Sequence, residues 1–227
     1  NSVGLAAQLE IETDDAATVQ VYARRYLPQT SFGWISPTGP GTAHIGLLGR
    51  EHPRAVLQDF TEGLERDGFK YQATSKPRFW GVPLRASRRS FSYRCLAVGD
   101  AAGQIKPTTG GGIYYAMKAA DMAADTLDDA LARDDFSNGR LKKYEENWKS
   151  LLGKELLLGY MARLFYERLT DAELDRILLA ADSSGILDGE VSFDHHSVLV
   201  TKALKSSLFM SVLGAVPGVA ARLALSR

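Results

Sequence analysis

The chain has 227 residues, of which 45% are hydrophobic and 24% are charged, so it can bury a substantial core in one large domain or two small ones. Its 27 Lys and Arg residues balance 27 Asp and Glu residues, and no net basic charge is left to attract nucleic acid. The single cysteine, Cys95, excludes an intramolecular disulfide and a thiolate cage around zinc, and it fits a cytoplasmic protein. We therefore expect no metal and no nucleic-acid partner.

The first part of the chain has the pattern of a sheet followed by a helix. Residues 18–48 contain short apolar stretches separated by Pro and Gly, which predicts an antiparallel meander. Pro53 then stands at a favourable first helical position, so we expect a helix over residues 53–67 that leans on this sheet. Its apolar residues share one helical face: Val56, Leu57, Phe60 and Leu64.

The most informative stretch is CLAVGDAAGQIKPTTGGGIYYAMKAADMAA, residues 95–124. CLAV predicts a short buried strand, with Cys95 as a small core residue, and Asp100 follows at the strand end where α/β sheets gather ligands. Helical periodicity begins at Ile113, which puts three glycines at the amino end of a helix. Unpaired N–H groups at that end can bind a phosphate or a flavin carbonyl, and glycine lets the ligand approach closely. Asp100 is placed to bind a hydroxyl group.

The last third of the chain has a helical pattern. Residues 141–169 predict one or two long helices, and Thr170 or Asp171 begins a further, capped helix. Within residues 202–227 basic residues flank an apolar run in which Pro217 argues against a membrane-spanning helix. We expect either two short amphipathic helices with peripheral membrane contact or a helical hairpin that covers the core.

Two polar clusters allow more than one interpretation. The first is an arginine-rich segment that could attract a substrate diphosphate or the phosphate of NADPH, although a solvated loop is the simpler interpretation: Arg85, Arg88, Arg89 and Arg94. The second is Asp194, His195 and His196, for which no further ligands at suitable spacing are found. We expect this second cluster to cap a helix or to pack.

The order of strand, GDAAG, PTTGGGI and alanine-rich helix resembles the second cofactor signature of para-hydroxybenzoate hydroxylase-type flavoproteins, and within them the geranylgeranyl reductase family. The resemblance implies that FAD is the cofactor, that Asp100 meets its ribitol, and that residues 111–113 approach its isoalloxazine. The implied cofactor-binding residues are Gly99, Asp100, Ala101, Gly103, Pro107, Gly110, Gly111, Gly112 and Ile113. GGG stands where many relatives have G-E-G, so no role of that glutamate is expected.

A second segment, SFGWISPTGPGTAHIGLL, resembles the family's Y-x-W-x-F-P unit, which walls the substrate cavity. Trp34 and Pro37 match this pattern, whereas Phe32 and Ser36 stand in place of Tyr and Phe. The implied substrate-binding residues are Phe32, Trp34, Ile35 and Pro37. The helical region after residue 134 also looks like that of bacterial members.

The resemblance implies an α/β fold, here an α+β fragment of such a flavoprotein. We expect residues 1–85 to be part of an antiparallel substrate-domain sheet with its helix, residues 86–133 a piece of the FAD-binding domain, and residues 134–227 a helical region. No G-x-G-x-x-G motif occurs in residues 1–60. We therefore expect a C-terminal fragment that carries half a cofactor site and is inactive alone.

The implied activity is reduction of carbon–carbon double bonds of a geranylgeranyl or polyprenyl lipid, with hydride from FAD and NADPH or another reductant as electron donor. No residue is a convincing proton donor, so no catalytic residue is predicted. Two alternatives stay open: a flavin-dependent monooxygenase of the same fold, and a non-catalytic lipid-binding domain. Because the implied substrate is a lipid, we expect a cytoplasmic protein that can also associate with the inner membrane face. The sequence predicts no oligomeric state.

Overall fold

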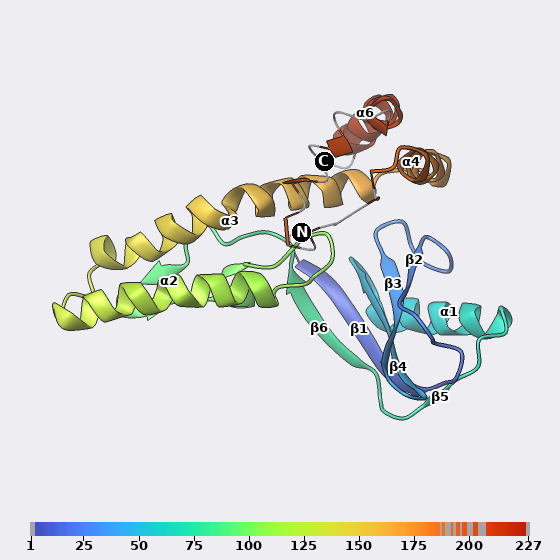
Figure 1. Cartoon of the computed structure of the whole chain (residues 1–227), viewed down its shortest axis with the longest axis horizontal. Helices are drawn as coiled ribbons and strands as arrows, with labels where there is room; N and C mark the ends of the chain where they lie inside the picture. Colours follow the sequence, from blue (N-terminus) through green and yellow to red (C-terminus); the bar gives the residue numbers. More distant parts are fainter. Residues whose placement is uncertain are drawn as a thin grey trace. The chain divides into compact units, whose positions relative to one another are not determined.

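The computed structural model describes residues 3–186 and 208–225, together with residues 188, 192, 194–195, 197–198 and 202–203. Two compact units follow one another along the chain. The first is Val3–Val82, and the second begins at Pro83. Figure 1 shows the antiparallel sheet of the first unit and the long helices of the second.

The first unit is built on a six-stranded sheet in which β2, β3, β4, β1 and β5 are neighbours in that order and β6 also pairs with β1. The strands are β1 (Val3–Glu12), β2 (Gln20–Ala23), β3 (Phe32–Gly39), β4 (Thr42–Gly49), β5 (Gln72–Ala73) and β6 (Arg78–Pro83). β2, β3 and β4 pair antiparallel with their neighbours, so the meander predicted for residues 18–48 is confirmed.

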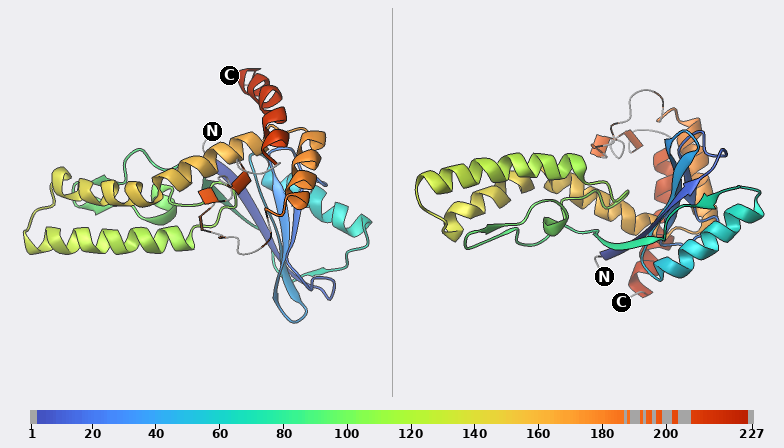
Figure 2. Two further views of the ribbon diagram at one scale, coloured as in Figure 1. Left: turned by 45° about the horizontal axis from the view of Figure 1, so that its top comes forward. Right: turned by 90° about the horizontal axis from the view of Figure 1, so that it is seen from below.

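One helix, α1 (Pro53–Arg66), covers one face of this sheet, as the views in Figure 2 show. Pro53 occupies the start of the helix, and the predicted apolar face is buried in a core with Ile35, Ile45 and Leu47 of the strands. Phe60 is fully buried and lies against Gly33, where a Cβ atom would come within 2.7 Å of its ring. This core packs the sheet against the helix and fixes which strand residues face away from it.

The second unit begins with a two-stranded hairpin, β7 (Phe91–Ser92) and β8 (Cys95–Leu96), and a short turn of 3-10 helix, η1 (Gly99–Ala102). The prediction that CLAV forms a buried strand was wrong. Only Cys95–Leu96 forms a strand, and Cys95 is exposed. The physical reason is that Cys95 pairs with Ser92 across a tight turn at Arg94, whose φ is 55°, so this two-residue strand lies at the surface.

Two long helices, α2 (Ile113–Ala132) and α3 (Asn138–Tyr166), lie side by side (Figure 1). α2 starts at Ile113 as predicted, and α3 is a single helix. Ala119 and Ala123 of α2 pack on Tyr144 and Trp148 of α3, and small side chains at this contact allow the helices to approach closely.

The chain then forms α4 (Asp171–Ser183) and α6 (Leu208–Leu225). Thr170 and Glu173 form the predicted capping box at the start of α4. The expectation of two short helices near the carboxyl end was wrong, because α6 is one helix with Pro217 inside it. Contacts beyond the proline hold it together: Val219 is buried against Leu169 and Leu174, and Arg222 pairs with Glu173 at 2.6 Å. In the parts of the chain described above, no helix is both long enough and apolar enough to cross a bilayer.

Candidate functional site

The GDAAG segment forms a tight turn that one buried side chain organises. Gly99 has a φ of 65°, and its N–H donates to Oε1 of Gln104 at 2.7 Å. The backbone of the turn closes through Gly103 N–H to Asp100 C=O at 2.9 Å and Gln104 N–H to Gly99 C=O at 3.0 Å. Asp100 is thereby presented at the surface, at the end of the loop that follows β8.

Gln104 also ties this turn to α3. Its Nε2 donates to the hydroxyl of Tyr144 at 2.8 Å, and that hydroxyl donates to the carbonyl of Ala97 at 2.8 Å. Burial raises the pKa of Tyr144, so its hydroxyl stays protonated and able to donate. Both side chains are fully buried, and sequence reasoning missed both of them. The signal that could have found Gln104 is its polar side chain directly after a glycine turn.

Gly103 is required for the turn itself. Its φ is 65°, and a Cβ atom would lie 2.5 Å from the carbonyl oxygen of Arg85. Gly103 is buried against this neighbouring backbone, so its role in the described structure is to let the two backbone segments meet. Ala101, the residue after Asp100, is exposed.

The glycine-rich segment before α2 forms a second turn. Lys106 N–H donates to Gly111 C=O at 2.9 Å, and Gly110 N–H, with a φ of 77°, donates to Lys106 C=O at 2.8 Å. Pro107 is buried against α3, where a Cβ atom on Gly159 would come within 3.1 Å of the Pro107 ring. The backbone hydrogen bonds therefore join the two ends of the turn, and the packing of Pro107 anchors its start on α3.

The start of α2 has the properties that an electron-rich ligand atom needs. Gly112 is the N-cap residue, and it has no side chain with which to cap the helix. Ile113 is 80% exposed and Gly112 is half-buried, so the amino end of α2 lies at the surface. The partial positive charge of the helix end adds to these donors and favours a carbonyl or an anion.

The two turns meet at Asp100 and Gly112. A Cβ atom on Gly112 would lie 3.4 Å from Oδ1 of Asp100, so the carboxylate lies beside the helix start. In the described part of the chain, no side chain forms a hydrogen bond or ion pair with this carboxylate. The Asp100 carboxylate, which can accept a hydrogen bond from a hydroxyl group, therefore lies beside the N–H donors at the start of α2. This pair of features fits the ribitol and the pyrimidine ring of FAD.

The candidate substrate-wall residues belong to the first unit, and they divide between the two faces of the sheet. Phe32 and Trp34 lie on one face with ring centroids 5.8 Å apart. Ile35 is fully buried on the other face, in the core under α1, so the structure does not bring it together with these rings. Pro37 is half-buried near the end of β3.

The two polar clusters are also located. The four arginines of residues 85–94 are exposed, as a solvated segment requires, and three of them lie over aromatic rings: Arg85 over Tyr160, Arg89 over Phe91 and Arg94 over Phe136. Asp194 pairs with Lys106, and the His195 ring packs near Tyr114; His196 lies outside the described residues. No group of metal-binding side chains is found among the residues that the structure describes.

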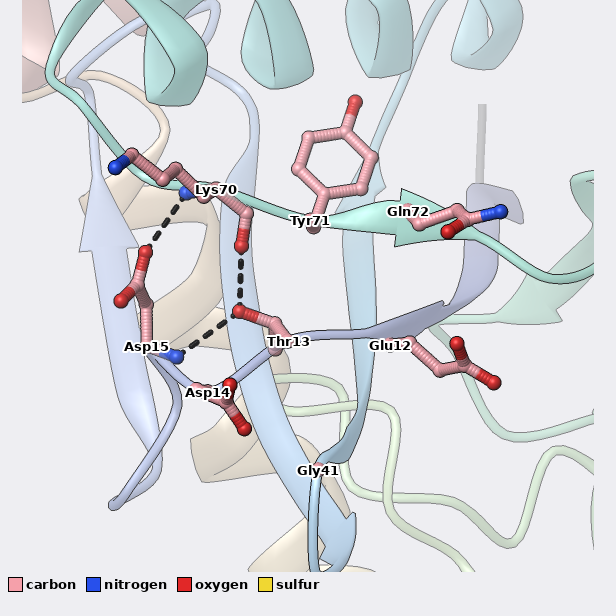
Figure 3. A pocket seen from close by; sticks show the side chains of 8 residues that line it. All are labelled: Glu12, Thr13, Asp14, Asp15, Gly41, Lys70, Tyr71 and Gln72. Atoms are coloured by element: carbon pink, nitrogen blue, oxygen red, sulfur yellow. Dashed lines mark hydrogen bonds between the residues drawn. The ribbon is translucent and has the colours of Figure 1, made fainter.

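Two hollows lie elsewhere in the chain. A polar hollow of about 490 Å³ in the first unit is shown in Figure 3, where Thr13 and Asp15 bind the backbone of Lys70. An apolar groove of about 470 Å³ lies between α3 and α6 in the second unit. It is lined by Leu158, Met161, Ala162, Leu164, Phe165, Val212, Val216, Val219 and Ala220. Neither hollow contains a predicted site residue.

Comparison with known proteins adds to this geometry. No family model matches the chain. It is 33% identical over 184 residues to a digeranylgeranylglycerophospholipid reductase of Methanocaldococcus jannaschii, a match that covers 79% of this chain and 46% of that protein. The chain thus spans about half the length of the curated relatives it matches.

Solved structures show the same fold. A geranylgeranyl bacteriochlorophyll reductase-like protein from Thermoplasma acidophilum superposes with a TM-score of 0.79 at 22% identity, over 96% of this chain and 55% of that one. A probable FAD-dependent monooxygenase from Pseudomonas aeruginosa superposes with a TM-score of 0.51 at 18% identity, over 74% and 49% of the two chains.

The fold is therefore that of the para-hydroxybenzoate hydroxylase-like FAD-binding proteins, as the sequence motifs predicted. Within this class, the named relatives and the first of these structures place the chain in the geranylgeranyl reductase family.

Proposed function

We propose that the protein to which this chain belongs is an FAD-dependent reductase of carbon–carbon double bonds in a prenyl lipid. The observation that carries this proposal is the meeting of the Asp100 carboxylate with the uncapped start of α2 at Gly112. The substrate class comes from the relative of Methanocaldococcus jannaschii, which is named for a digeranylgeranyl lipid. Bound FAD would supply the hydride for the double bond.

The chain's own residues would bind and orient. Asp100 would accept a hydrogen bond from the ribitol, and the N–H groups of Gly112 and Ile113 would donate to the pyrimidine carbonyl. Ala101 is exposed, and Gly110 and Gly111 add no side chain of their own beside this backbone. Gly99, Gly103 and Pro107 act indirectly, because they hold the two turns in place. Phe32 and Trp34 remain candidates for the wall along the lipid, and we leave Ile35 out of that wall because it has no exposed surface.

Three finer points belong to the same proposal. NADPH or another reductant would supply the electrons. The isolated chain would bind FAD weakly and be inactive, since it spans about half of its relatives. The protein would be cytoplasmic and would touch the inner membrane face through the residues of 202–227, where Leu213 and Val216 of α6 are exposed. Sedimentation of the full-length protein with vesicles, compared with its L213D/V216D variant, tests this last point.

The test of the activity uses the full-length protein, purified with FAD. Anaerobic NADPH or dithionite should bleach the oxidised flavin absorption, and a digeranylgeranyl lipid should restore it while gaining one pair of hydrogen atoms per double bond by mass spectrometry. Recovery of colour without any change in lipid mass would contradict the reductase. Rapid peroxide formation with an aromatic substrate would favour the monooxygenase alternative instead, which the Pseudomonas aeruginosa structure makes worth testing.

A non-catalytic lipid-binding domain remains the second candidate, and the apolar groove between α3 and α6 favours it. On this alternative, a prenyl lipid binds the chain equally well with and without FAD. Titration of a fluorescent geranylgeranyl lipid against the wild-type chain and its V216D variant measures this directly. A full-length protein that cannot be reconstituted with FAD would leave this alternative as the better account.

A further inference from the structure

A cationic side chain is built into the glycine-rich turn. The backbone of Lys106 closes the turn on both sides, through its hydrogen bonds with Gly110 and Gly111. Its side chain folds back over the same turn, because a Cβ atom on Gly111 would lie 3.0 Å from Cε and 3.5 Å from Nζ of Lys106. The side chain of Lys106 is only 14% exposed. The ammonium group is thus fixed beside the backbone that precedes α2.

A carboxylate from a distant part of the chain partly balances this charge. Nζ of Lys106 lies 3.0 Å from Oδ1 of Asp194, whose side chain is 36% exposed. The hydroxyl of Tyr115 donates to the backbone carbonyl of Asp194 at 2.8 Å, and Ser197 N–H donates to Glu155 at 3.0 Å. These contacts dock Asp194 and Ser197 on α2 and α3, so the carboxylate is held near the ammonium by more than the ion pair.

The two charges would act with opposite signs on a ligand at this turn. An ammonium beside the start of α2 adds to the positive end of the helix, whereas the Asp194 carboxylate subtracts from it. A flavin gains negative charge on its pyrimidine ring when it is reduced, and nearby charge is one of the means by which a protein tunes its electronics.

We propose that the ammonium group of Lys106 raises the reduction potential of the bound flavin, and that the Asp194 carboxylate moderates this effect. The inference rests on the proposed function, because it needs FAD at the turn. It adds a residue pair that the motif resemblance does not assign. It also gives the segment around Asp194 a role at the cofactor rather than at a metal.

The test measures the midpoint potential of FAD in the full-length protein, by equilibration with reference dyes. K106Q should favour the oxidised flavin about tenfold over wild type, which for a two-electron couple is a lowering of about 30 mV. K106R keeps the charge and should stay near the wild-type value. D194N should shift the potential in the opposite direction to K106Q, because it removes the negative partner.

Each outcome decides the question. K106Q and K106R with equal potentials, or K106Q and D194N shifted in the same direction, would overturn the inference while leaving the flavoprotein intact. If K106Q fails to fold, D194N still tests the proposal, because Asp194 does not belong to the glycine-rich turn. An unchanged midpoint potential in D194N would contradict the proposal. A wild-type protein that binds no FAD would overturn the proposed function itself, and that result is recognised before any variant is compared.

Discussion

The indole of Trp34 lies directly on the backbone of Gly46, its register partner on the neighbouring strand. A Cβ atom on Gly46 would come within 2.6 Å of Nε1 of Trp34, so the ring lies flat on the strand only because no side chain stands beneath it. The pair sets the position of the aromatic face of the sheet.

Replacing Gly46→Ala should therefore displace the indole. We expect a loss of about 1–3 kcal/mol in the free energy of unfolding, as for other overpacked sites, together with a change in tryptophan fluorescence. Urea denaturation measures the loss. The same change in a Trp34→Ala background should cost much less, because the ring that clashes is gone; equal costs in both backgrounds would contradict the contact.

Tyr144 holds the GDAAG turn to α3 through one hydroxyl. Tyr144→Phe leaves the buried amide of Gln104 without its acceptor and the carbonyl of Ala97 without this donor, so we expect about 1–3 kcal/mol of destabilisation. Tyr160→Phe on the same helix is the matched control and should change stability little. Similar stabilities of the two variants would show that the hydrogen bonds contribute nothing net.

The raised pKa of Tyr115 should make the free energy of unfolding depend on pH in the alkaline range. Burial, with a further contribution from Glu155 and Asp194, raises its pKa from 10.0 to about 12. The folded state therefore favours the neutral phenol, and this contribution is complete below pH 10 and is lost as the pH rises toward 12. Tyr115→Phe should flatten the fall in unfolding free energy over that window, as measured by urea denaturation at a series of pH values. An identical pH profile for Tyr115→Phe and wild type would contradict the burial argument.

Asp100→Ala in the full-length protein should weaken FAD binding. A hydrogen bond to a charged group contributes about 1.5–3 kcal/mol, which corresponds to roughly a tenfold to hundredfold rise in Kd. Fluorescence titration of the apoprotein with FAD measures it. Asp121→Ala, on the exposed surface of α2, is the control, and equal affinities in both variants would remove Asp100 from the site.

Elements with a local signal could be predicted from the sequence. The start of α2 follows from three glycines and a 3.6-residue apolar period, and the buried face of α1 and the cap at Thr170 follow from patterns of similar length. The same stretch also pointed to Asp100 and Gly112, which the structure brings together.

Long-range features could not be predicted in this way. The partners of Gln104 and Lys106 lie 40 and 88 residues further along the chain, and no periodicity encodes such pairs. The exposure of Cys95 depends on a two-residue hairpin that apolar composition cannot distinguish from a buried strand. The continuity of α6 through Pro217 depends on contacts with α4, so a helix-breaking residue gave the wrong boundary.

Because α3 is one unbroken helix with contacts along its whole length, its number of residues is more constrained than its composition. Four residues along α3 each make a different long-range contact. Tyr144 forms a hydrogen bond with the GDAAG turn, and Glu155 accepts one from Ser197. Gly159 packs against the ring of Pro107, and Phe165 lines the apolar groove. At 1.5 Å per residue, these four contact residues span about 30 Å along the helix axis. One inserted or deleted residue between Tyr144 and Gly159 would rotate everything beyond it by about 100°, so that contacts at one end could be kept only by losing those at the other. Many substitutions on its outer face are compatible with this spacing, but no change in residue count is.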